Sequence, residues 1–244
     1  MYTLANYASI QKTMKYTLPP SVKQQIQSLF VDLGIQQEFT IVSTPKTSSQ
    51  DIIREVNKLT NDNKKTQIPI ILTILNDHVQ ECSEKLMTIL CDNSFFSSVY
   101  VELFLQLIQW NEFNEQFTIK FQNYLRDLQC IQIGDSENYD EYCDFKKKNN
   151  SLKNFTTFLC HLQTNDLYLA HYVQTIQVLF SSIDETIHSN KKDIMNELIE
   201  HVFILTLPTP HFPIDKVKAY STMDTIPYKF IFKCLDIIKK FDLK

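Results

Sequence analysis

Apolar residues recur at three- and four-residue steps through most of the chain, from about residue 51 to the C-terminus. This spacing places them on one face of an α-helix, whereas a half-buried strand would alternate apolar and polar residues. The pattern therefore predicts a series of amphipathic helices. The clearest stripes are Val99, Leu103 and Leu107; Phe117, Phe121, Leu125 and Leu128; Phe155, Phe158, Leu159 and Leu162; Val173, Ile176, Leu179 and Phe180; Ile194, Leu198, Val202 and Leu205; and Phe230, Ile231, Leu235 and Ile238.

Short polar turns join these predicted helices, so consecutive helices are expected to form antiparallel hairpins. A hairpin about every 40 residues is the period of HEAT-type solenoids, in which each hairpin buries its stripe against its neighbours. We therefore predict an all-α fold, a HEAT-like solenoid of about five antiparallel helical hairpins. A compact helical bundle is the alternative that the pattern leaves open. Pro69 fits a predicted helix over residues 68–79 if it lies in the first turn.

Residues 1–48 differ from the rest of the chain. Pro19-Pro20 interrupts them, a helix is predicted from Val22 to Leu33, and a linker rich in Ser and Thr follows around Pro45. We predict two parts: an N-terminal extension over residues 1–48 and a helical repeat domain over residues 49–244.

The tetrapeptide Asn57-Lys58-Leu59-Thr60 predicts the joint of the first hairpin. One helix is expected to end there, and Thr60 is expected to cap the next helix at once, because a threonine side chain can accept a bond from a free N–H of the first turn. The preceding Leu59 would pack back on that turn as a hydrophobic staple.

The composition agrees with helices and narrows the function. Only 2 of the 244 residues are glycine, which excludes folds built on glycine-rich phosphate loops. No apolar run approaches the roughly 20 residues that span a bilayer, so we expect a protein that does not enter membranes. The six cysteines lie far apart without CxxC pairs, which favours reduced core residues over a disulfide framework.

The net charge of -4 argues against a dedicated high-affinity binder of the phosphate backbone. Local basic patches still allow weak RNA contact, and a solvated helix face explains them equally well. The candidate RNA-binding residues are Lys146, Lys147, Lys148 and Lys153.

Candidate catalytic and metal sites are weak. His78 and Cys82 lie four residues apart on one predicted helix, but no second pair of ligands follows, so we expect no metal and no other cofactor. Neither glycine lies in a nucleophile elbow or a phosphate loop, and we expect no enzymatic activity.

Several motifs fall in the same order as in a known family. The first joint reads Val56-Asn57-Lys58-Leu59-Thr60, where the family has leucine-asparagine-lysine-leucine-threonine. Further on come Asn93 to Tyr100, Lys120 to Arg126, a charged insertion, a helix start at Ser151-Leu152-Lys153-Asn154, and Pro227 to Phe232. Over about residues 51–242 the chain resembles the middle domain of eukaryotic translation initiation factor 4G. It departs from the family pattern at Lys153, Cys160 and Cys234, which replace two glycines and an aspartate.

The resemblance implies a scaffold that binds a DEAD-box RNA helicase, initiation factor 4A, and contacts both of its lobes. The implied contacts lie on hairpin turns: Asn57, Lys58, Asn61 and Asp62 for one lobe, and Arg126, Tyr228 and Lys229 for the other. The cytoplasm is the implied location. Because richness in Ile, Asn and Lys is typical of AT-rich genomes, such as those of protists and large DNA viruses, this would be the host cytoplasm if the source is viral.

Two alternatives to this function remain. A related helical-repeat adaptor would act in nonsense-mediated decay, in the cap-binding complex or with poly(A)-binding protein. A solenoid adaptor with unrelated peptide partners is also compatible with the pattern. A cap-binding protein is a further candidate partner of the N-terminal extension, although the usual motif of tyrosine, four residues and leucine is absent there.

Overall fold

The structure is a computed structural model that describes residues 49–131, 133, 138–206, 209 and 211–242, together with residues 20–22, 24, 25 and 28. The chain divides into two units, residues 1–46 and 47–244. Most of the extension and linker predicted over residues 1–48 lies outside the described residues, and the described positions between 20 and 28 are helical.

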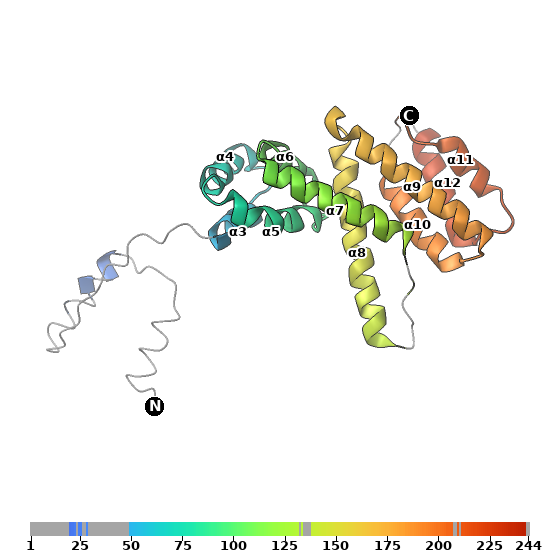
Figure 1. The fold of residues 1–244 in the computed structure, drawn as a ribbon, viewed down its shortest axis with the longest axis horizontal. Coiled ribbons are helices and arrows are strands. Elements are labelled where there is room, and N and C mark those ends of the chain that lie inside the picture. Colours follow the sequence, from blue (N-terminus) through green and yellow to red (C-terminus); the bar gives the residue numbers. More distant parts are fainter. Residues whose placement is uncertain are drawn as a thin grey trace. The chain divides into compact units, whose positions relative to one another are not determined.

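The described part of residues 47–244 is all-α (Figure 1). Its elements are α3 (Ser49–Asn57), α4 (Lys64–Leu75), α5 (Val79–Cys91), α6 (Ser97–Leu107), α7 (Asn111–Gln129), α8 (Tyr139–Leu162), the 3-10 helix η1 (Asp166–Tyr168), α9 (Leu169–His188), α10 (Lys192–Ile204), α11 (Ile214–Ser221) and α12 (Tyr228–Asp242).

These helices pack as a repeat of five hairpins. Within hairpins, α3 contacts α4, α5 contacts α6, α7 contacts α8, α9 contacts α10 and α11 contacts α12. Between hairpins, α3, α5, α7 and α9 pack in sequence as one layer, and α4, α6, α8, α10 and α12 pack in sequence as the second layer. This two-layer order confirms the predicted all-α, HEAT-like repeat of hairpins.

The core runs continuously between the two layers, from Ile52 to Ile237. Phe104 of α6 lies at its centre, fully buried, with ring centroids 5.1 Å from Phe117, 5.5 Å from Phe158 and 5.5 Å from Tyr168. Aromatic rings at these separations attract one another in addition to burying apolar area, so this cluster holds the middle hairpins together.

Two predicted helix limits are wrong. Helix α4 begins at Lys64 and ends at Leu75, so Pro69 is its sixth residue rather than part of the first turn. Pro69 has no backbone N–H to donate to the Lys65 carbonyl. The proline is tolerated because both residues are exposed, so that water can donate to this carbonyl instead.

Helix α8 has no start at Ser151. It begins at Tyr139 and continues unbroken through the charged segment that the sequence placed in an insertion. In Figure 1 the first half of α8 extends away from the neighbouring helices, and residues 139–148 are exposed or half-buried. The helix extends through this segment although the segment has no apolar stripe. Helix propensity favours it, and the side chain of the N-cap residue Asn138 accepts a hydrogen bond from the Glu141 N–H.

Candidate functional site

The turns within the five hairpins share one edge of the repeat. Consecutive helices from α3 to α10 are joined by connections of three to nine residues and alternate in direction, so the helices of one layer run the same way. Helix α12 also runs the same way as α10, because Lys233 pairs with Glu200 and Lys240 lies over the Phe203 ring. Their C-terminal ends, and the turns that follow them, therefore face the same way. We name this edge the turn edge; it comprises the described parts of residues 57–63, 92–96, 126–139, 189–191 and 222–229.

The joint of the first hairpin is held by Asn63 rather than by Thr60. The Asn63 side chain donates to the Lys58 carbonyl (2.7 Å) and accepts from the Thr60 N–H (2.8 Å). Since α4 starts at Lys64, the predicted cap at Thr60 is wrong, and the intervening turn is closed by an asparagine that bridges two backbone groups. Leu59 is 1% exposed, as a packed joint requires.

The four candidate contact residues of this joint are all exposed: Asn57, Lys58, Asn61 and Asp62. Lys58 pairs with Glu55 at 2.6 Å, and the hydrogen bond from Lys58 lowers the pKa of that carboxyl group. Gln67 of α4 donates to the same carboxyl group at 2.8 Å. The joint thus presents a rigid polar surface on a fixed backbone.

A second group of candidates gathers around Asp127, where α7 ends beside α8. Lys148 approaches this carboxylate at 3.3 Å and Arg126 at 3.9 Å. Lys146 lies over the rings of Tyr142 and Phe145, and Lys147 is 83% exposed. The structure therefore brings Arg126 next to one of the four candidate RNA-binding lysines, Lys148, whereas Lys146 and Lys147 contact other residues of α8.

Lys153 does not join that group. It pairs with Glu197 of α10 at 2.8 Å, with only 28% of its side chain exposed, and Asn149 donates to the same carboxylate oxygen. It links α8 to α10 inside the second layer.

The most exposed large hydrophobic side chains also lie on the turn edge. Among the described residues these are Phe95 (86%), Tyr228 (81%) and Tyr139 (76%). They come from three different hairpins. Exposed aromatic residues that can enter a partner's pockets are typical anchors of protein interfaces.

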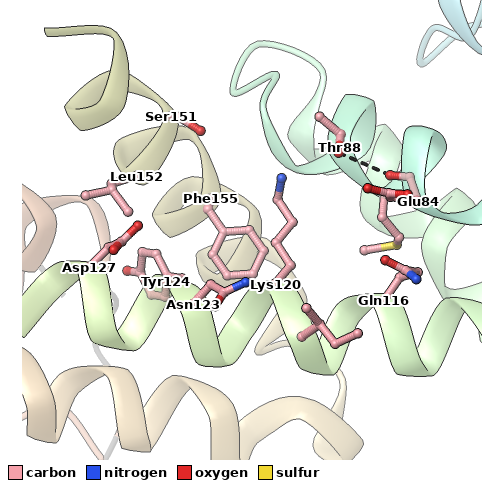
Figure 2. Close-up of a pocket in the computed structure, with 12 residues that line it drawn as sticks. Glu84, Thr88, Gln116, Lys120, Asn123, Tyr124, Asp127, Ser151, Leu152 and Phe155 are labelled. Atoms are coloured by element: carbon pink, nitrogen blue, oxygen red, sulfur yellow. Dashed lines mark hydrogen bonds between the residues drawn. The ribbon is translucent and has the colours of Figure 1, made fainter. Parts of the chain in front are cut away.

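A groove of about 310 Å³ opens between α5, α7 and α8 next to this edge. Figure 2 shows Lys120, Asn123 and Tyr124 on α7 facing Ser151 and Phe155 on α8, with Lys120 extending between α8 and α5. The lining is mixed, with carboxylates, amides and hydroxyl groups beside apolar carbon, and it can accept a polar side chain or peptide segment of a partner.

Asp92, the C-cap residue of α5, fixes one end of the groove. Its carboxylate accepts from Lys120 (3.3 Å) and Ser151 (3.0 Å), and its backbone carbonyl accepts from Asn154 (2.5 Å). One residue thus ties α5 to α7 and α8, so the groove walls are fixed relative to each other.

No family model, curated protein or solved structure matches this chain. The features of the chain that bear on its function are therefore the sequence motifs and the geometry of the turn edge.

Metal and membrane sites are not found in the parts of the chain that the structure describes. These parts contain no group of three or more His, Cys, Asp and Glu residues placed to hold a metal ion. They also contain no helix that is long and apolar enough to cross a bilayer. Of the six free cysteines, Cys82, Cys91 and Cys234 are buried, whereas Cys130 is exposed on the turn edge.

The sequence analysis missed Phe95 and Tyr139 as interface candidates. Both stand in polar segments, Asn93-Ser94-Phe95 and Asn138-Tyr139-Asp140, where no apolar stripe needs an aromatic residue. An aromatic side chain at a predicted hairpin turn, outside any helical stripe, was the signal that could have identified them.

Proposed function

We propose that this chain is a translation-initiation scaffold that binds a DEAD-box RNA helicase of the initiation factor 4A type through its turn edge. The observation that carries the proposal is that two of the most exposed aromatic side chains, Phe95 and Tyr228, lie on turns of that edge, as do the polar and basic residues that the resemblance assigns to helicase contact. Aromatic anchors supply affinity, and the charged residues around them supply orientation.

The arrangement suits a partner with two mobile lobes. Asn57, Lys58, Asn61 and Asp62 belong to the first hairpin and would contact one lobe, while Arg126, Tyr228 and Lys229 belong to later hairpins and would contact the other. A scaffold that binds one relative orientation of the lobes better than others shifts the helicase towards that orientation. Its effect is stimulation of the partner's RNA-dependent ATPase, with no catalytic residue or cofactor of its own.

RNA contact is a minor part of the proposal. Lys146, Lys147 and Lys148 lie on the exposed half of α8 next to Arg126, where they can reach RNA held by the helicase. Asp140, Glu141 and Asp144 on the same half of the helix limit the positive potential, so the contact is weak. The proposed location is the cytoplasm, where translation starts.

A second candidate is a related adaptor of RNA metabolism with a different partner. The observation that favours it is the unbroken course of α8 through Ser151, where the resemblance implies a helix start. The extended first half of α8 changes the surface beside Arg126, and a changed surface selects a different partner.

The test is a binding titration of the chain with a helicase of the initiation factor 4A type from the same source, together with its RNA-dependent ATPase rate. We expect saturable binding and stimulation. Lys58→Glu and Arg126→Glu should each weaken binding about tenfold, and the melting temperature should stay the same.

Lys85→Glu is the matched control, because Lys85 is exposed in the middle of α5, away from the turn edge. If the folded chain does not bind the helicase, the scaffold proposal fails and the adaptor remains. If it binds but both edge variants behave like Lys85→Glu, the helicase uses another surface.

A further inference from the structure

Helix α12 is apolar on two opposite faces. Phe230, Cys234 and Ile237 are fully buried against the repeat. On the opposite face, Tyr228, Phe232 and Leu235 are 81%, 65% and 48% exposed. A helix that is apolar on both sides is normally covered on both sides.

Exposed charged residues of both signs lie beside this outer face, whereas Lys233 and Lys240 turn towards α10, where Lys233 pairs with Glu200 and Lys240 lies over the Phe203 ring. Asp224, in the turn before α12, is followed by Lys229, Asp236 and Lys239, and all four are exposed. None of them makes an ion pair with another described residue. The order of acidic, basic, acidic and basic groups is one that an antiparallel copy of itself can match.

We propose that the outer face of α12 binds the same face of a second copy of this chain, with the two α12 helices antiparallel about a two-fold axis at Phe232. In this register Phe232 meets Phe232 of the second copy, and Tyr228 meets Leu235. Lys229 then lies opposite Asp236, and Lys239 comes near the turn that carries Asp224. The three pairings within α12 agree on one register to within a residue.

The geometry supports each pairing. Lys229 and Asp236 are two helical turns apart and so lie on the same flank of α12, and in antiparallel helices related by a two-fold axis the same flanks face each other. Each contact is therefore made twice. The apolar face supplies the binding energy, and the ion pairs at its rim fix the register, because exposed pairs add little affinity.

The expected dimer is weak. The 15 residues of α12 span about 22 Å, and only a narrow face of each helix takes part. An interface of this size lies at the small end of specific interfaces, so a dissociation constant in the micromolar range is expected.

This inference does not depend on the helicase proposal, although both use Tyr228 and Lys229. If both hold, the dimer and the helicase compete for this end of the repeat. Phe232 belongs only to the dimer face, so it separates the two proposals.

The first test is sedimentation equilibrium of the full chain from low micromolar to near-millimolar concentration. We expect a reversible monomer–dimer equilibrium, which Phe232→Glu should weaken at least tenfold by placing two carboxylates at the two-fold axis. Leu167→Glu is the matched control, since Leu167 is 67% exposed but lies in η1 on the opposite edge. Circular dichroism should show both variants folded.

The second test exchanges the charges. Lys229→Glu alone and Asp236→Lys alone each place like charges opposite each other twice and should each weaken the dimer about tenfold. The double variant Lys229→Glu/Asp236→Lys should restore it. An equal mixture of the two single variants should also restore it, because each then meets its opposite charge.

A chain that stays monomeric at every concentration would overturn the proposal. So would a dimer that Phe232→Glu weakens no more than Leu167→Glu does. A dimer that is sensitive to Phe232→Glu but shows no recovery in the double variant or in the mixture would overturn the antiparallel register.

Discussion

At the scale of single residues, the hydroxyl group of Thr156 joins three helices. It lies 2.8 Å from the Tyr124 hydroxyl on α7, 2.7 Å from His201 Nδ1 on α10 and 2.8 Å from its own helix's Leu152 carbonyl. One arrangement satisfies all three contacts: Tyr124 and the Nδ1–H of His201 donate to Thr156, which donates to Leu152. Burial, which lowers the pKa of His201, keeps its ring neutral with the proton on Nδ1.

Replacing Thr156 by valine should destabilise the fold by about 2–4 kcal/mol, because two buried donors would lose their acceptor. Urea unfolding measures the change. Thr157→Val is the control, since the Thr157 hydroxyl bonds only to the Lys153 carbonyl of its own helix (3.0 Å). Equal losses in the two variants would show that the buried contacts contribute nothing specific.

His201 should make stability depend on pH. Burial lowers its pKa to about 3, while the unfolded chain titrates near 6.5. The contribution of the neutral His201 to the unfolding free energy is complete above pH 6.5. It falls by up to about 1.4 kcal/mol per pH unit as the pH drops towards 3, because in that range only the unfolded chain binds the proton.

Unfolding free energies at pH 7.5 and pH 5 should therefore differ by about 2 kcal/mol from this residue alone. Burial also lowers the pKa values of His161 and His171, which adds in the same direction. In His201→Asn the amide can still donate to Thr156 but does not titrate, so its pH dependence should be smaller. An unchanged pH dependence would assign the effect to the other histidines.

At the scale of helices, the sequence predicted those with a buried stripe and missed those without one. The stripes of α6 and α7 are buried as predicted, since Leu103, Leu107, Phe117 and Phe121 are at most 2% exposed. Helix α11 has only Val217 and Tyr220 in the core, too few for a period to be recognised. Leu235 matches the stripe of α12 by spacing but is exposed, because spacing does not show which apolar face of a helix has a neighbour.

The first half of α8, which the sequence did not predict as helix, should be able to unfold without destabilising the core. Lys147→Pro should remove helical signal from residues 139–148 and change the unfolding free energy by less than about 1 kcal/mol, because little surface is buried there. Thr157→Pro, in the packed half, should cost about 3 kcal/mol or more. Circular dichroism and urea unfolding measure both. A large loss in Lys147→Pro would mean that the first half of α8 supports the core.

At the scale of the whole repeat, the candidate site depends on topology that no local pattern contains. Residues 57–62, Arg126 and Tyr228 come together on one edge only because the helices of each layer run parallel. The motifs predicted these positions separately. It is the packing order of the hairpins that places them on a common edge. The groove beside α7 was not predicted, because its third wall, α5, is separated from α7 and α8 in the sequence by the whole of α6.

Truncation of a buried phenylalanine and of an exposed one should have different effects on the unfolding free energy and on binding. Phe104→Ala removes a ring that contacts Phe117, Phe158 and Tyr168, and it should cost about 3–5 kcal/mol, since the neighbouring helices cannot fully close the cavity. Phe95→Ala, at 86% exposure, should change the unfolding free energy by less than about 0.5 kcal/mol. If the turn edge binds the helicase, Phe95→Ala should nevertheless weaken that binding. A Phe95→Ala variant with full stability and full binding would remove this aromatic residue from the interface and leave Tyr228 and the polar residues of the edge as candidates.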